Sequence, residues 1–286
     1  MCDDFTQIAE QAALSRRQFG LIGAGAAAVI GAPGGVLAAT ASALSESTVA
    51  VTTPDGTCDA FFVRPAKGKH PGVILWPDIG GLRDAFKEMA RRLAGHGFAV
   101  LAVNHYYRGG KAPVLESFSQ FRTPEGMAKL KPLIAGVNPA TTVRDSKAFV
   151  AWLDAQKSVD SKRKIGNYGH CMTGSYTVRA AAAVPERIGA SASLHGGGLV
   201  GAAADSPDKL LASTKASFLF AIARNDDAKA PTDKDGLKAA AKAANRPAEV
   251  EVYKADHGWT VLDSPTYDKA EADRAFARML ALFGKL

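Results

Sequence analysis

One cysteine of the chain stands where a nucleophile would be expected. Cys171 lies within the segment GHCMTG, residues 169–174, between a predicted strand at 164–168 and a helical pattern at 172–184. A strand, a sharp turn and a helix in this order form a nucleophile elbow, which exposes the nucleophile above a sheet and needs small neighbours. The helix N-terminus would favour the thiolate. We therefore predict that Cys171 is a nucleophile, the alternative being a buried structural cysteine.

A histidine and an aspartate follow in the order that a catalytic triad requires. His257 comes after the predicted strand 249–253, where the general base is expected. After the strand 218–223, Asp226 or Asp227 could orient that histidine and stabilise its charged form. Counting forward from the strand favours Asp226, counting back from Pro231 favours Asp227, and we choose Asp226.

The remaining histidines have no spacing that indicates a metal site. We interpret these five as structural: His70, His96, His105, His170 and His195. Of them, His105 is also a candidate for the wall of the pocket. The sequence predicts neither a metal nor a cofactor.

Two backbone amides would have to stabilise an oxyanion that forms when a thiolate attacks a carbonyl. One is the amide of Met172, directly after the predicted nucleophile. The other candidate is Ile79, in the loop 77–81 that follows the predicted strand 72–76. Glycines in this loop allow its backbone to approach closely.

Short apolar runs alternate with helical patterns along the chain. Strands are predicted at 48–53, 60–64, 72–76, 98–103, 164–168, 190–194, 218–223 and 249–253, and helices at 85–94, 143–153, 172–184, 237–244 and 270–283. This alternation predicts βαβ units and a mostly parallel sheet of about eight strands with helices on both faces, the layout of the α/β-hydrolase fold. A turn at Pro54-Asp55-Gly56 would form a hairpin at one edge. Residues 109–139 are poorly patterned and are a candidate lid.

These segments together resemble the dienelactone hydrolase family over about residues 48–284. A cysteine in the elbow is rare among α/β-hydrolases, and the triad and the 77–81 loop match as well. The resemblance implies that Asp78, where the family has a Glu, helps to activate the thiol. It also implies that Tyr107 and Arg108 bind the substrate, with Arg108 on its carboxylate. The alternative for Arg108 is a structural ion pair with Asp78 or another acid.

One position departs from the pattern that the dienelactone-specific enzymes share. They carry a second Arg four residues after the catalytic His, where this chain has Val261. Because an apolar side chain cannot replace bidentate recognition of a carboxylate, half of the expected clamp is absent. We therefore expect a hydrolase of esters or lactones, resembling carboxymethylenebutenolidase, whose natural substrate is open and could be anionic. The alternative is an exported binding protein that captures a small ligand without turnover.

The first 43 residues differ from the rest. Arg16-Arg17, an apolar run at 20–39 and small residues at 41–43 follow one another, as in a twin-arginine export signal. We expect residues 1–43 to direct export to the periplasm, the alternative being an uncleaved membrane anchor, and residues 44–286 to form one domain. The export machinery is the only membrane partner we expect.

Composition and charge narrow the possible partners. The 286 residues are 47% hydrophobic and carry a net charge of +7 that is dispersed along the sequence. Because no basic stripe with interleaved aromatics occurs, we expect no nucleic-acid binding. We predict a monomer. Cys58 and Cys171 are predicted to lie too far apart for a disulfide.

Overall fold

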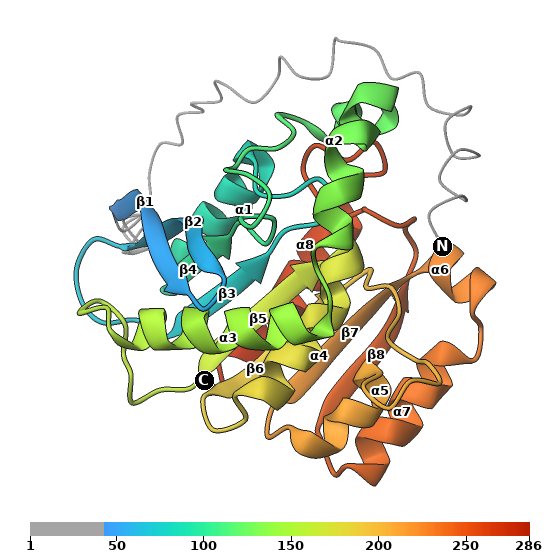
Figure 1. Ribbon diagram of the computed structural model, residues 1–286. Coiled ribbons are helices and arrows are strands. Elements are labelled where there is room, and N and C mark those ends of the chain that lie inside the picture. The colour runs from blue at the N-terminus through green and yellow to red at the C-terminus, as the bar shows by residue number, and fades with distance from the viewer. Residues whose placement is uncertain (1–42) are drawn as a thin grey trace, which may run out of the picture. The chain divides into compact units, whose positions relative to one another are not determined.

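An eight-stranded sheet runs through the described part of the chain and carries helices on both faces (Figure 1). The computed structural model describes residues 43–286. The strands are β1 (Leu44–Thr53), β2 (Gly56–Pro65), β3 (Gly72–Trp76), β4 (Ala99–Val103), β5 (Ile165–His170), β6 (Ile188–Leu194), β7 (Ser217–Ala223) and β8 (Ala248–Tyr253). Their spatial order is β1-β2-β4-β3-β5-β6-β7-β8. β2 runs opposite to the other seven strands, which are parallel to one another, and this confirms the predicted α/β-hydrolase fold.

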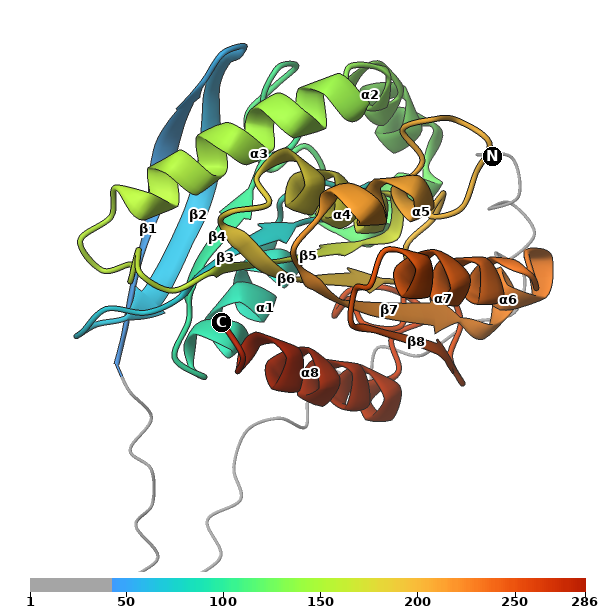
Figure 2. The same ribbon diagram turned by 90° about the horizontal axis from the view of Figure 1, so that it is seen from below.

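The helices divide between the two faces of the sheet, as Figure 2 shows from below. They are α1 (Asp84–Ala94), α2 (Pro124–Ala135), α3 (Pro139–Asp154), α4 (Gly174–Ala183), α5 (Pro207–Leu210), α6 (Arg224–Lys229), α7 (Asp233–Ala243) and α8 (Lys269–Phe283). α1 and α8 cover one face, and α3, α4 and α7 cover the other. Short 3-10 helices occur at η3 (Phe118–Arg122), η4 (Cys171–Thr173) and η5 (Leu211–Ser213).

The central strands are buried on both sides, which explains their continuous apolar sequences. All five residues of β3 are buried. Ile74 and Trp76 belong to the cluster beneath α3 and α4, while Val73 and Leu75 belong to the cluster beneath α1 and α8. Because successive side chains of a strand point to opposite faces, one short strand contributes to both halves of the core.

Helix α3 begins four residues before the predicted helix, because its first turn is capped by polar side chains. The Asn138 side chain accepts a hydrogen bond from the Thr141 amide at 3.1 Å. In return, the Asn138 amide donates to the Thr141 hydroxyl at 2.9 Å. This capping box, with Pro139 at the first helical position, fixes the start of the helix where the apolar pattern is still weak.

The segment 109–139 contains η3 and α2 and lies against the elbow. Its apolar side chains form a separate cluster with Ile79 and Tyr106, and Cys171 and Met172 pack against this cluster. The fully or largely buried members from the segment are Leu115, Phe121 and Leu130. The candidate lid therefore forms an apolar cover over the predicted nucleophile.

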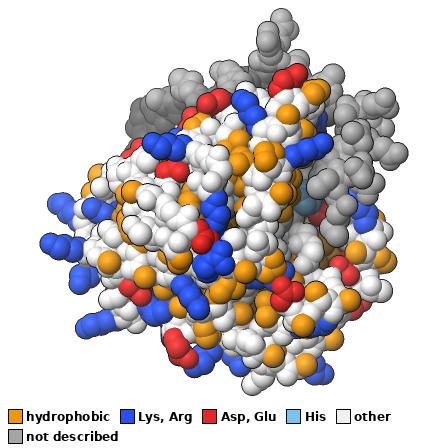
Figure 3. All heavy atoms as spheres, viewed as in Figure 1, with side chains coloured by type: hydrophobic (Ala, Val, Ile, Leu, Met, Phe, Trp, Pro, Cys, Tyr) orange, Lys and Arg blue, Asp and Glu red, His pale blue; other side chains and the backbone are white. Residues whose placement is uncertain are grey.

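The predicted export signal, residues 1–43, lies outside the described residues except for Ala43, and it stays a prediction. Residues Ser42–Leu286 form one compact unit. No helix within residues 43–286 has the length and apolar character that crossing a membrane requires. On the face drawn in Figure 3, basic side chains lie in small groups with acidic and apolar side chains between them.

Candidate active site

The predicted nucleophile stands in a sharp turn between β5 and α4. Cys171 has a φ of 58°, a left-handed conformation that is rare for a residue with a Cβ and that costs about 1–3 kcal/mol. The side chain of Thr173 stabilises this turn, because its hydroxyl accepts from the His170 amide at 3.0 Å and donates to the Trp76 carbonyl at 2.9 Å. The elbow is thereby anchored to the end of β3.

Two glycines allow close approaches at the elbow, Gly169 within the turn itself and Gly174 between the start of α4 and the end of β6. A Cβ on Gly169 would lie 2.4 Å from the Thr173 carbonyl oxygen. A Cβ on Gly174 would lie 2.5 Å from the Cα of Gly196. The close approaches therefore fall at positions 169 and 174, which explains why position 173 can hold a threonine where glycine is commoner.

The structure brings His257 and Asp226 together. The Nδ1 of His257 lies 2.6 Å from the Asp226 carboxylate. The neighbouring carboxylate, Asp227, binds Lys234 instead, at 2.7 Å. The His257 amide donates to the Asn225 side chain at 2.9 Å, which fixes the loop after β8 against the start of α6. Of the two aspartates that the sequence left open, Asp226 is the one beside the histidine.

The surroundings of His257 favour its protonated form. Burial alone would lower the pKa of His257, but the Cys171 side chain, through its charge and its hydrogen bond, and the Asp226 carboxylate together raise this pKa to about 10. Such an arrangement stabilises a thiolate and an imidazolium side by side. Cys171 is free and partly exposed, and Cys58 is free and buried, its thiol donating to the Asn104 carbonyl at 3.4 Å.

The predicted oxyanion amides have no acceptor in the surrounding backbone. Neither Ile79 nor Met172 donates its N–H outside the helix and strand ladders of the described residues. The hydroxyl of Tyr106 donates to the Ile79 carbonyl at 3.0 Å and contacts the Met172 sulfur at 3.5 Å. Tyr106 therefore holds both residues that would supply the oxyanion amides. The resemblance indicated its neighbour, Tyr107, instead.

Asp78 is buried and bound to an arginine that the sequence analysis did not consider. Its two carboxylate oxygens accept from Arg83 at 2.7 and 3.0 Å. Arg83, whose side chain is 0% exposed, also binds Asp263 at 2.8 Å. Asp263 in turn accepts from the Phe118 amide at 2.9 Å, which joins this ion-pair cluster to the apolar cover. Val261, where the second substrate-binding Arg was expected, is 1% exposed and packs in the core.

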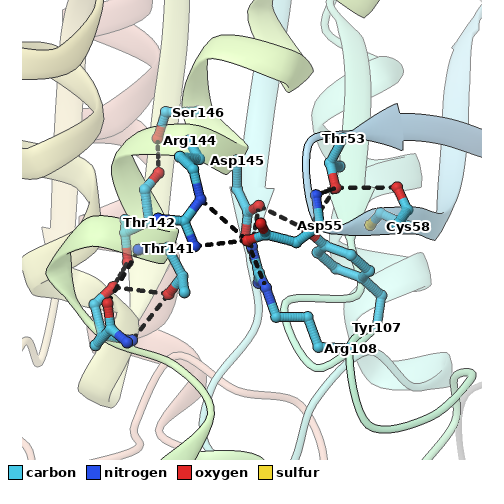
Figure 4. Close-up of polar contacts among 12 residues, drawn as sticks. Thr53, Asp55, Cys58, Tyr107, Arg108, Thr141, Thr142, Arg144, Asp145 and Ser146 are labelled. Carbon is cyan, nitrogen blue, oxygen red and sulfur yellow. Dashed lines mark hydrogen bonds and ion pairs between the residues drawn. The ribbon is translucent and has the colours of Figure 1, made fainter.

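Tyr107 and Arg108 bind partners within the protein. Arg108 contacts the carboxylates of Asp55 and Asp145, both at 2.6 Å. The Tyr107 hydroxyl donates to Asp145 at 2.9 Å and lies 2.6 Å from the Thr53 hydroxyl, as Figure 4 shows. None of the hydrogen bonds of these two side chains in the described region reaches Cys171 or His257. The structure thus places Arg108 in a structural ion-pair cluster, the alternative weighed from the sequence, although its partners are Asp55 and Asp145 rather than Asp78.

A further histidine, His195, contacts the backbone of the proposed nucleophile. The Cys171 amide donates to Nδ1 of His195 at 3.1 Å, and Nε2 of His195 lies 2.9 Å from the Thr260 hydroxyl. The sequence alone predicts a structural role for His195. The signal that could have found it is its place at the end of β6, at the same edge of the parallel sheet as the elbow.

No group of three or more His, Cys, Asp or Glu side chains within residues 43–286 is arranged to hold a metal ion. The chemistry available at this site is that of a thiol, an imidazole, carboxylates and backbone amides.

Comparison with known proteins adds to this geometry. A model of the dienelactone hydrolase family matches residues 58–286. A protein of Methylorubrum extorquens named "Putative carboxymethylenebutenolidase" is 27% identical over 249 residues, 85% of this chain and 82% of that protein. A protein of the same name from Salmonella typhi is 26% identical, and the match covers 85% and 88% of the two chains.

Solved structures give the same result. The crystal structure of a "Putative Dienelactone Hydrolase" from Klebsiella pneumoniae superposes with a TM-score of 0.73 and is 25% identical in sequence. The match covers 85% of this chain and 100% of that one. A dienelactone hydrolase-like promiscuous phosphotriesterase from metagenomic libraries has a TM-score of 0.70 and 25% identity, covering 85% and 99%.

Proposed function

The chain belongs to the dienelactone hydrolase family, and from this premise we propose that it hydrolyses carboxylic esters or lactones through Cys171, His257 and Asp226. Family membership indicates a hydrolase and does not favour the non-catalytic binding protein considered above. The observation that carries the proposal is the contact between Cys171, in its left-handed turn, and His257, whose other ring nitrogen lies 2.6 Å from Asp226.

In the first half of the proposed reaction, the Cys171 thiolate attacks the carbonyl carbon of the ester. The oxyanion of the tetrahedral intermediate accepts hydrogen bonds from the Met172 and Ile79 amides. Collapse of the intermediate breaks the carbon–oxygen bond, and the departing alkoxide takes its proton from the His257 imidazolium. The product of this half is a thioester on Cys171.

In the second half, neutral His257 removes a proton from water, and the resulting hydroxide attacks the thioester carbon. The same two amides hold the second oxyanion. Its collapse releases the carboxylic acid and returns the thiolate beside the imidazolium. Asp226 keeps the Nδ1 proton of the ring in place, so that Nε2 is the atom that gives and takes protons.

The charges near the site favour an uncharged substrate over an anionic one. Arg108 already binds two carboxylates, those of Asp55 and Asp145, and Arg83 binds those of Asp78 and Asp263. Each guanidinium is therefore neutralised within the protein. The cover that packs on Cys171 is apolar. We propose neutral esters or lactones with an apolar acyl group as the substrate class, since burying an unpaired carboxylate there would be unfavourable.

A panel of lactones and p-nitrophenyl esters, matched in size and differing in charge, tests the function. We expect Cys171→Ala to abolish turnover while the circular dichroism spectrum stays that of the wild type. Cys58→Ala is the matched control, because Cys58 is the other free cysteine of the described chain and is buried away from the site. We expect it to keep full activity, and neutral esters to be cleaved faster than anionic ones.

Two results would contradict the proposal. Full activity of Cys171→Ala would remove the nucleophile from the mechanism. Stoichiometric release of product by the wild type, with no further turnover, would favour ligand capture over catalysis.

A further inference from the structure

A chain of hydrogen bonds behind the elbow joins loops from three strands. The Cys171 amide, after β5, donates to Nδ1 of His195, after β6, at 3.1 Å. Nε2 of His195 and Nδ1 of His170 lie 2.9 and 3.0 Å from the hydroxyl of Thr260, after β8. The three side chains of His170, His195 and Thr260 are at most 6% exposed. Residues from distant parts of the sequence are thus connected behind the proposed nucleophile.

The directions of the first two bonds in this chain follow from its first donor. A backbone N–H can only donate, so Nδ1 of His195 must accept, and a neutral ring then carries its proton on Nε2. That proton is donated to the Thr260 hydroxyl, which can in turn donate to Nδ1 of His170. One tautomer of His195, with the proton on Nε2, satisfies both hydrogen bonds of its ring.

The same connection joins two strained residues. Cys171 and His195, with φ of 58° and 42°, are two of the three non-glycine residues at positive φ within residues 43–286. The backbone of His195 is held as well, because its amide donates to the Ala221 carbonyl on β7 at 2.8 Å. Strained conformations persist where the surroundings over-determine them, and they concentrate at functional sites.

We propose that His195 is a positioning residue of the proposed hydrolase: by accepting from the Cys171 amide, and through Thr260, it holds the nucleophile's turn in register with the loop that carries His257. The inference rests on the proposed function. Fixing the Cys171 amide fixes the following peptide, and with it the direction of the thiol and of the Met172 N–H.

His195 keeps this role while a charged ring stands next to it. The ring centroids of His195 and His257 are 4.8 Å apart. Protonation of His195 would place a donor on Nδ1, opposite the Cys171 N–H. Burial, and the neighbouring His257 on the loop after β8 and His170 on β5, hold the pKa of His195 well below its usual value. The acceptor for Cys171 is therefore retained when His257 is the imidazolium.

Two substitutions of His195 by an amide residue distinguish the role of its Nδ1 from that of its Nε2. In His195→Asn, the side-chain oxygen can occupy the place of Nδ1 and accept from Cys171, but nothing reaches Thr260. In His195→Gln, the polar atoms extend to the place of Nε2 near Thr260, and the acceptor for Cys171 is lost. The two variants carry the same amide group and differ in reach. Because Asn also tolerates the positive φ of position 195 better than Gln, their thermal stabilities are compared alongside the rates, and Thr260→Val, which leaves this backbone unchanged, is measured with them.

We expect kcat on a neutral p-nitrophenyl ester to fall about 100-fold in His195→Gln with KM little changed, since a misplaced nucleophile slows the chemical step. In His195→Asn we expect kcat to fall only about tenfold, because the hydrogen bond from the Cys171 amide is retained. Alkylation of Cys171 by iodoacetamide, which needs no ester substrate, should slow in the same order. Thermal unfolding followed by circular dichroism checks that both variants are folded.

Equal losses in the two variants, or a larger loss in His195→Asn, would overturn the proposal. Should His195→Gln fail to fold, Thr260→Val takes its place, because valine keeps the shape of threonine and removes the hydroxyl. Wild-type kcat and alkylation rate in Thr260→Val would then count against the proposal, and a loss in both would support it. If the wild type cleaves no ester, the proposed function fails, while the alkylation series still tests whether His195 positions the thiol.

Discussion

The Asp226 carboxylate, in α6 after β7, lies 2.6 Å from Nδ1 of His257, in the loop after β8. The adjacent Asp227 binds Lys234 at 2.7 Å and has no hydrogen bond to the histidine. Two neighbouring aspartates thus have separate roles, one beside the proposed general base and one in a structural ion pair.

This difference predicts that the same substitution, Asp to Asn, lowers kcat strongly at position 226 and hardly at position 227. We expect Asp226→Asn to lower kcat between about 100-fold and about 10,000-fold, because an amide no longer stabilises the imidazolium and can favour the wrong tautomer. Asp227→Asn, the control, should change kcat little and lose only a partly exposed ion pair. Steady-state kinetics on one neutral ester compares the two. Similar losses in both variants would mean that Asp226 has no special part in the reaction.

The raised pKa of His257 predicts where activity is lost at high pH. Its pKa is raised to about 10, so the ring keeps its proton up to that pH and loses it above. Protonation of the leaving alkoxide requires that proton, so kcat/KM should fall as the pH rises through about 10. In Asp226→Asn, the carboxylate that helps to raise this pKa is gone, and the fall should move to lower pH. A pH–rate profile of the wild type and of Asp226→Asn tests this prediction. A high-pH limb at the same pH in both proteins would contradict it.

Periodicity and strand order predicted the elements that carry the site, but not how each loop presents its side chains. The strand before His257 alternates apolar and acidic residues, the strand before Cys171 is a short run that ends in the glycine-containing elbow, and parallel strands bring their carboxyl ends to one edge of the sheet. Asp226, by contrast, lies in the six-residue helix α6. The sequence Asn-Asp-Asp contains no apolar periodicity that would predict this helix. The helix is too short for a hydrophobic pattern to form.

Side-chain contacts between loops could not be predicted from the sequence, because loops have no periodicity that indicates where a side chain points. Tyr106 and Tyr107 are adjacent in a turn without periodicity, so nothing in the sequence tells which ring faces Ile79 and which faces Asp145. The pairing of Asp78 with Arg83 depends on how the 77–81 loop folds back on the start of α1. Such side-chain pairs follow from tertiary packing, which one sequence does not report.

The two tyrosines give a further matched pair of variants. Tyr106→Phe removes the donor to the Ile79 carbonyl, and we expect kcat to fall about tenfold as the oxyanion loop loses that hydrogen bond. Tyr107→Phe removes the bonds to Thr53 and Asp145, and we expect it to lower the free energy of unfolding by about 1–3 kcal/mol with kcat unchanged. Kinetics and urea unfolding of both variants test this. A kcat loss confined to Tyr107→Phe would restore the substrate-binding role first predicted for Tyr107.

The buried cluster of Asp78, Arg83 and Asp263 predicts a strong effect on stability. Arg83 is 0% exposed and is bound on both sides, so Arg83→Met would leave two carboxylates facing each other without a cation. We expect the free energy of unfolding to fall by about 3–5 kcal/mol. The matched control is Arg224→Met, because Arg224 is 62% exposed in its ion pair with Asp256, and the loss there should be much smaller.

Replacing the carboxylates as well separates charge from packing. If unpaired charge is the cause, Arg83→Met combined with Asp78→Asn and Asp263→Asn should recover part of the lost stability, since neutral amides need no cation. Urea unfolding of the wild type, the single variant and the triple variant measures this. Because Asp263 also accepts from the Phe118 amide, the single variant should loosen the apolar cover over Cys171 and speed alkylation of the thiol. An unfolding free energy of Arg83→Met equal to that of Arg224→Met would show that the buried ion pairs contribute no more than exposed ones.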